Sequence, residues 1–261
     1  MDVVGVDLAW QSTKNTSAAA VGTLENSVLT VHELREDLNC IDAVLDLVAS
    51  HADVNGLAID APLIINNQTG QRACERALAR DYGSKKAGCH ASNRTLYPEP
   101  SSVELADRLS ARGFDHLASP ADTRWQIECY PHPAIIEMFG LAERHRYKKG
   151  NVEAKRQGQV GLARLIRRLA SSPLLRLAVD ARFDSFLNAS EIGAKRGAAL
   201  KRNEDALDAI VCAYVAGLYA VGAASTVYGD AVEGYIYVPQ VHCLDAEWSE
   251  PFVGTPDCGS P

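Results

Sequence analysis

The chain has 261 residues, of which 47% are hydrophobic and 23% charged, as in an ordinary globular protein. No apolar run reaches the roughly eighteen residues of a membrane span, and seven cysteines without a Cys-x-x-Cys pair argue against a disulfide framework or a zinc knuckle. The first residues lack the basic start and apolar core of a signal peptide, so we expect a cytoplasmic protein with no membrane partner. The length favours one domain, predicted over residues 1–240 and followed by a loop-like tail at 241–261.

The formal net charge of −7 is unevenly distributed. Residues 144–202 hold 15 Lys and Arg against 4 Asp and Glu, whereas the remainder holds 11 against 29. An acidic body with one basic segment is compatible with binding a polyanion, because the local field matters more than the total charge. The alternative is that these charges form solvated helix faces.

The N-terminal half predicts the element order β-β-β-α-β. The first stretch, Val3–Ala9, reads as a buried strand because three of its residues are β-branched valines. Two further strands are predicted at 16–23 and 28–34, then an amphipathic helix at 41–49, and then a short apolar strand at 55–60.

Three predicted strands end in an acid: Asp7 closes the first, Asp60 the fourth, and Glu128 a later strand over 125–129. A carboxylate is costly to bury unless it is paired or holds a metal. Each acid has a structural alternative, since Asp60 precedes Ala-Pro and could cap a helix, while Glu128 could pair with an arginine. Matching positions on two strands nevertheless favour a site.

Residues 66–124 are predicted to form an insertion or lid. It contains a helix over 71–82, a polar loop over 83–100 that includes His90, and a short helix over 104–112. A loop of this length is uncommon unless it is functional or disordered.

A compact basic stretch at 144–150 contains Arg146, Lys148 and Lys149 around one tyrosine. These cations are candidates for phosphate contacts. The helix that follows, over 152–170, has a leucine stripe that we assign to the core.

The second chemical anchor is a helix predicted over 203–214, with Asn203 as its N-cap. Asp205 and Asp208 lie three residues apart and therefore share one helix face. Two carboxylates on one face of a mostly apolar helix are typical of a metal site. A last strand is predicted at 234–239, at a sheet edge.

Five fragments carry a family resemblance: Gly-Val-Asp-Leu-Ala (5–9), Ile-Asp-Ala-Pro (59–62), Glu-Cys-Tyr-Pro (128–131), Tyr-Lys-Lys-Gly (147–150) and Asn-Glu-Asp-Ala-Leu-Asp-Ala (203–209). In this order they resemble a bacterial and archaeal family of unknown function whose members are described as predicted RNase H-like nucleases. The last fragment also looks like the final catalytic helix of RuvC-type resolvases, which carry Glu where this chain has Asp60. The resemblance covers roughly residues 1–240.

The resemblance implies an α/β, ribonuclease H-like fold with a mixed central sheet, three antiparallel strands followed by parallel ones, flanked by helices. It further implies a nuclease in which Mg²⁺ or Mn²⁺ is held by Asp7, Asp60, Asp205 and Asp208, with Glu128 as a further catalytic acid. Arg146, Lys148 and Lys149 would then neutralise the phosphates of a nucleic-acid partner.

Other functions fit the same fold class. Sugar kinases and actin-like ATPases place acids on the same two strands, but they follow them with Gly-rich phosphate hairpins, whereas Asp7 is followed by Leu-Ala-Trp-Gln. A non-catalytic module that binds nucleic acid or protein, and an enzyme acting on a small phosphorylated substrate, also remain as alternatives.

Overall fold

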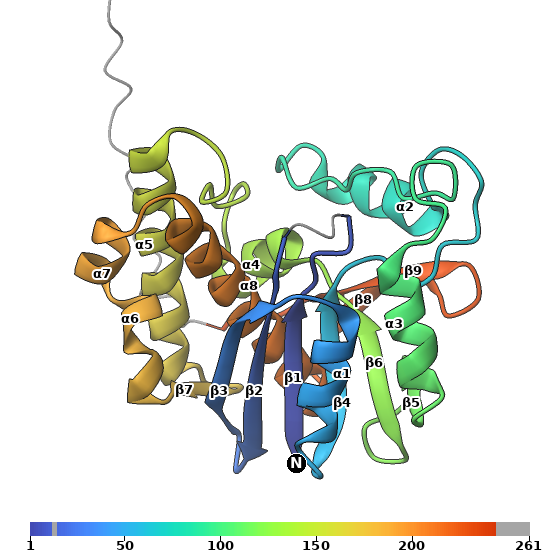
Figure 1. The fold of residues 1–261 in the computed structure, drawn as a ribbon, viewed down its shortest axis with the longest axis horizontal. Helices are drawn as coiled ribbons and strands as arrows, with labels where there is room; N and C mark the ends of the chain where they lie inside the picture. The colour runs from blue at the N-terminus through green and yellow to red at the C-terminus, as the bar shows by residue number, and fades with distance from the viewer. Residues whose placement is uncertain (12–14, 244–261) are drawn as a thin grey trace, which may run out of the picture.

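A seven-stranded mixed sheet forms the centre of the computed structural model, which describes residues 1–11 and 15–243 (Figure 1). The strand order is β5-β6-β4-β1-β2-β3-β7. Strand β2 is antiparallel to β1 and β3, and the other four pairings are parallel. The α/β class and the mixed sheet are therefore confirmed. The strands are β1 (Asp2–Asp7), β2 (Ser17–Glu25), β3 (Val28–Leu38), β4 (Val54–Asp60), β5 (Phe114–His116), β6 (Arg124–Glu128) and β7 (Arg176–Val179).

Helices cover both faces of this sheet, which is why β1 is a continuous apolar run rather than an alternating one. Val4 and Val6 face the core shared with α1 and α3, while Val3 faces the core shared with α8. The helices are α1 (Ile41–Ala49), α2 (Ala73–Tyr82), α3 (Ser101–Ser110), α4 (Pro131–Phe139), α5 (Val152–Arg168), α6 (Asp184–Leu187), α7 (Ala189–Ala194) and α8 (Gly197–Ala220), with 3₁₀ turns at Leu169–Ser171 and Ala181–Phe183.

Helix α8 lies directly on β1. A Cβ atom on Gly5 would stand 1.9 Å from the backbone nitrogen of Ala213 and 2.3 Å from the carbonyl oxygen of Ala209. The helix and strand backbones can approach this closely only because glycine has no side chain at the crossing point. The position of α8 relative to the sheet is thus set by a backbone contact.

The predicted N-cap of this helix is wrong. Helix α8 begins at Gly197, so Asn203 lies inside it, and the buried Asn203 amide donates a hydrogen bond to Oε1 of Gln159 on α5. Asparagine resembled a cap in the sequence because acids follow it. Those acids pair with Lys201, one turn earlier in the helix.

The segment 66–124 is only partly a peripheral insertion. Its helix α2 packs against a separate antiparallel hairpin of β8 (Ser225–Asp230) and β9 (Gly234–Pro239). Its later part, however, supplies α3 to the core and β5 to the main sheet.

The strand predicted at 234–239 is β9, which pairs with β8 in a separate two-stranded sheet. All six residues of β9 are buried, and Tyr237 forms a bridge to Cys129 just after β6. Of the predicted tail 241–261, residues 244–261 lie outside the described part of the chain. Within residues 1–11 and 15–243, no helix is long and apolar enough to cross a bilayer.

Candidate functional site

Four of the five predicted acids meet where β1 and β4 end. Asp7 and Asp60 are direct register partners in the parallel β1–β4 pair, so both carboxylates leave the sheet at the same edge. Helix α8 brings Asp208, which is fully buried, and Asp205, whose carboxylate lies within hydrogen-bonding reach of Asp7. We call Asp7, Asp60, Asp205 and Asp208 the carboxylate cluster.

Two lysines face this cluster. The Nζ atom of Lys148 lies 2.8 Å from Oδ2 of Asp208, and the hydroxyl of Tyr147 donates to Oδ1 of the same carboxylate at 2.5 Å. The Nζ atom of Lys201 lies 2.6 Å from Oδ1 of Asp205. The ammonium of Lys148 reaches the cluster from the loop before α5, and that of Lys201 from the first turns of α8.

The negative charge of the cluster exceeds what these lysines neutralise locally. Desolvation raises the pKa of Asp60 to about 7, with Lys148 acting in the opposite direction and the charge of Asp208 adding to the rise. The pKa of Asp7 is raised well above its usual range, first by desolvation, and Asp60, Asp205 and Asp208 all contribute repulsion. Carboxylates with raised pKa values that converge in one cleft are typical of a site that binds a cation or moves protons.

The backbone of the basic stretch at 144–150 is anchored on two helices, α8 and α5. Tyr147 is fully buried and ties the stretch to α8 through Asp208. On the other side, Gly158 of α5 allows close approach, because a Cβ there would stand 2.1 Å from the carbonyl oxygen of Arg146. The exposed Arg146 and Lys149 line the same cleft as the carboxylates.

This cleft has a volume of about 650 Å³. Beside it, the loop after α2 contacts the start of the basic stretch: the Arg144 backbone N–H donates to the Lys85 carbonyl oxygen at 2.9 Å, and Lys86 forms an ion pair with Glu143. The residues that line the cleft include the acids Asp7 and Asp60, the cations Arg144, Arg146, Lys148 and Lys149, and the rings of Trp10, His90, Tyr130, His132, His145 and Tyr147.

His132 lines the cleft as a neutral imidazole. The residue is 8% exposed, and its Nδ1 atom has no hydrogen-bond partner among the described residues. Burial lowers the pKa of His132 to about 3, and the charge of Lys148 acts in the same direction. An imidazole that is neutral at physiological pH can donate or accept one hydrogen bond in this wall.

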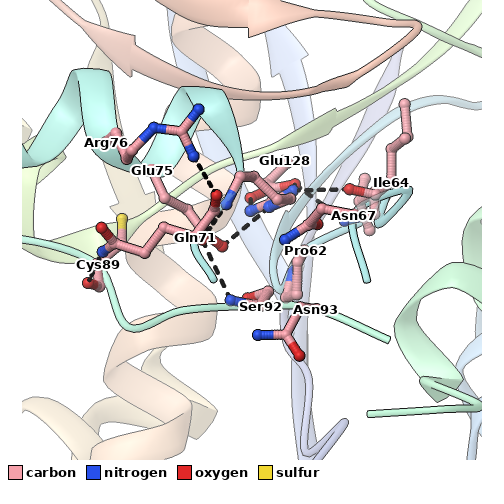
Figure 2. Close-up of polar contacts among 12 residues, drawn as sticks. Pro62, Ile64, Asn67, Gln71, Glu75, Arg76, Cys89, Ser92, Asn93 and Glu128 are labelled. Atoms are coloured by element: carbon pink, nitrogen blue, oxygen red, sulfur yellow. Dashed lines mark hydrogen bonds and ion pairs between the residues drawn. The ribbon is translucent and has the colours of Figure 1, made fainter. Parts of the chain in front are cut away.

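Glu128, the fifth predicted acid, has a different environment. Arg72 binds its carboxylate with both terminal nitrogens, at 2.8 Å and 2.5 Å, and the Leu63 backbone N–H donates to Oε2 at 2.9 Å. The Nε atom of Arg72 also pairs with Glu75 at 2.9 Å. Figure 2 shows Glu75 and Glu128 with their neighbours, including Ser92, whose backbone N–H donates to Glu75. We call Arg72, Glu75 and Glu128 the arginine network.

The two oxygens of Glu128 are used by Arg72 and a backbone amide, which is the structural alternative considered for this acid, while a catalytic role for Glu128 stays a prediction. The arginine network joins α2, the end of β6 and the segment around Ser92, whose N–H donates to Glu75 at 3.2 Å. Sequence reasoning considered an arginine partner for Glu128 but could not identify it, since Arg72 is 56 residues away.

Sequence reasoning also missed Tyr147 and Lys201 as partners of the cluster. Tyr147 was visible only as an aromatic residue inside a basic run, and such a residue reads equally well as a stacking group. Lys201 precedes Asp205 by four residues, a spacing that places both on one helix face and could have identified it.

The donor chemistry of the cluster fits Mg²⁺ or Mn²⁺, which prefer carboxylate oxygens. As the side chains stand in residues 1–11 and 15–243, however, no three of His, Cys, Asp or Glu are close enough together to hold one ion. The carboxylates converge, but a lysine ammonium lies against the most buried of them.

A comparison with family models finds one match, described as "Protein of unknown function (DUF429)", over residues 5–233. The chain belongs to the DUF429 family. The matched span includes the whole carboxylate cluster, the basic stretch and the arginine network, so all three lie in the part that is shared with DUF429. Searches of the curated proteins and of the solved structures find no match.

Proposed function

We propose that this DUF429 protein is a divalent-metal-dependent nuclease built on a ribonuclease H-like fold. The observation that carries the proposal is the register pairing of Asp7 with Asp60 on adjacent parallel strands, completed by Asp208 from a helix packed on β1. Lone strand-end acids are common, but Asp7 and Asp60 line one cleft and Asp208 lies buried behind them, an arrangement that capping or solvation does not explain.

The topology supports this proposal. Three consecutive antiparallel strands are followed by α1 and by β4, which pairs beside β1. Helix α8 covers the face of the sheet opposite to α1. This is the arrangement that the resemblance to RNase H-like proteins implies. Fold alone does not establish activity, so the proposal depends on the cluster.

In the proposed reaction Asp7, Asp60, Asp205 and Asp208 hold one or two Mg²⁺ or Mn²⁺ ions. Such ions, when bound, activate water and stabilise the leaving oxygen of a phosphodiester. The chain itself binds and orients the substrate: Arg146 and Lys149 are exposed in the cleft wall and can contact its phosphates. His132 offers one hydrogen bond from the same wall.

The test is cleavage of a labelled panel of single-stranded and duplex DNA and RNA, a hybrid and a branched junction, with Mn²⁺ or Mg²⁺. The wild-type protein is compared with Asp7→Asn, which removes one charge without changing the side-chain volume. We expect metal-dependent cleavage of at least one substrate and its loss in Asp7→Asn, with circular dichroism unchanged. A fully active Asp7→Asn protein would refute the proposal.

A second candidate function is hydrolysis of a small phosphate ester by the same cluster. The cleft volume of about 650 Å³ favours it, because a cleft of this size holds a nucleotide-sized ligand. Nucleoside monophosphates, dinucleotides and p-nitrophenyl phosphate belong in the same panel. Turnover of these compounds without cleavage of any polymer would favour this candidate over the nuclease.

A further inference from the structure

Lys148, proposed above as a phosphate contact, is already paired with a carboxylate of the cluster. Its Nζ atom lies 2.8 Å from Oδ2 of Asp208, a carboxylate with no exposed surface, while the lysine side chain is 28% exposed. It is also the positive charge with the largest effect on the pKa of both Asp7 and Asp60. The Lys148 ammonium therefore acts as the cation at Asp208 in this structure.

We propose that Lys148 and a divalent metal ion exchange at Asp208, so that metal binding releases the ammonium to contact a substrate phosphate. The proposal rests on the metal-dependent function above, and it adds a coupling between the two ligands. A cation at Asp208 and a phosphate at Lys148 would then favour each other's binding.

Apart from the ion pair with Lys148, Oδ2 of Asp208 has no partner among the described residues. Oδ1 accepts the Tyr147 hydroxyl, but Oδ2 has no hydrogen-bond partner within the described residues, and only the ion pair with Lys148 compensates its charge. A buried carboxylate oxygen without a partner is strongly unfavourable. Lys148 can therefore leave only if another cation takes its place.

The backbone of the basic stretch is anchored, whereas the Lys148 ammonium lies at the end of a long side chain. Tyr147 is fully buried and held by Asp208, and the backbone of Arg146 packs against Gly158, so the loop itself is anchored on two helices. Lysine carries its charge on a flexible four-carbon stem. The side chain can therefore rotate into the cleft, toward Arg146 and Lys149, without moving the backbone.

The charge of the incoming ion also favours the exchange. The described side chains hold no ready three-residue metal site, although four carboxylates converge. A divalent ion carries twice the charge of an ammonium, so it interacts more strongly with the same carboxylates. It can displace Lys148 for that reason, and the carboxylates can close around it once the ammonium has left.

The experiment is calorimetric titration of Mn²⁺ into the full-length wild-type protein and the Lys148→Met and Lys149→Met variants. Both substitutions remove one positive charge from the cleft, but only Lys148 is paired with Asp208. We expect Lys148→Met to bind Mn²⁺ at least tenfold more tightly than wild type, and Lys149→Met to stay within about twofold. Equal affinity in all three proteins would overturn the exchange but leave the metal site in place.

If Mn²⁺ binds none of the proteins, including Lys148→Met, the proposed function itself fails. A second measurement uses the wild-type protein alone, so it does not depend on whether a variant folds. Acetylation of Lys148 by a small amine-reactive ester, followed by peptide mass spectrometry, is expected to be slow without metal and several-fold faster with saturating Mn²⁺. Lys149 serves as the internal control and should not change. An unchanged Lys148 rate at saturating Mn²⁺ would contradict the exchange.

Discussion

The carboxylate cluster and the arginine network are both groups of buried acids beside the ends of neighbouring strands, yet their partners differ. In the arginine network a guanidinium binds Glu128 with two nitrogens and Glu75 with a third, and backbone N–H groups from Leu63 and Ser92 complete the set. In the carboxylate cluster, by contrast, four acids face two lysines, and Oδ2 of Asp208 depends on one flexible side chain.

This difference separates a structural group from a functional one. Arginine presents a planar fork that fixes carboxylate geometry, whereas lysine is a point charge that another cation can replace. Fully satisfied polar networks rigidify a fold, and acids left with replaceable partners remain available for ligands. The comparison predicts opposite responses to substitution in the two groups.

The largest effect is expected in the arginine network. Arg72→Met would leave Glu75 and Glu128 buried without their cation, so we expect the free energy of unfolding to fall by about 3–5 kcal/mol. Urea denaturation at pH 7 measures it, with Arg76→Met, an exposed arginine on the same helix, as the control. A loss below about 1 kcal/mol would mean that the network is not a structural tie.

The carboxylate cluster should make the protein less stable as pH rises. The folded-state pKa of Asp60 is about 7, above its ordinary 3.8, so the unfolded chain binds fewer protons between these values and stability falls as pH rises. Without metal, we expect the free energy of unfolding to drop by about 2 kcal/mol from pH 5 to pH 8. Asp60→Asn should reduce this slope, with the raised pKa of Asp7 supplying the remainder, and a wild-type slope of the opposite sign would contradict the assignment.

Substituting the cluster should affect ligand binding rather than stability. Asp60→Asn relieves repulsion at pH 8, so the metal-free variant is expected to be at least as stable as wild type. Its Mn²⁺ affinity should fall about tenfold, equivalent to about 1.4 kcal/mol. Calorimetry and thermal melts measure the two quantities. A destabilised variant with unchanged metal affinity would place Asp60 with the structural acids.

The smallest effect is expected at Lys201. Its side chain is 56% exposed, twice as much as that of Lys148, so solvent already screens its interaction with Asp205. Lys201→Met should increase Mn²⁺ affinity only about two- to threefold, measured by the same calorimetry. An increase as large as that of Lys148→Met would show that the two lysines are equivalent.

Local patterns predicted much of this molecule. The order of the first five elements followed from β-branched runs, turn residues and helical spacing. The adjacency of the strands that carry Asp7 and Asp60 was implied by the family resemblance, and the register confirms it. The shared face of Asp205 and Asp208 followed from helical spacing. These features depend on residues that are close in sequence or on a repeated pattern.

The errors and omissions concern distant contacts. Asn203 looked like a cap because its partner, Gln159, is 44 residues away, and the burial of β9 could not be predicted because it depends on β8 and α2. The short strands β5 and β7 carry too few residues for a pattern. The partners of Asp208 and Glu128 likewise come from elements whose proximity exists only in the folded chain.

The glycine under α8 has a consequence for how this site can vary. The distance between Asp7 and Asp208 is set where backbone meets backbone at Gly5, so no rearrangement of side chains can restore it once a methyl group separates the two elements. Substitutions among the acids alter chemistry on an intact scaffold. A substitution at Gly5 would instead push α8 away from β1. Every residue of the cluster would still be present, but Asp205 and Asp208 would be displaced from Asp7.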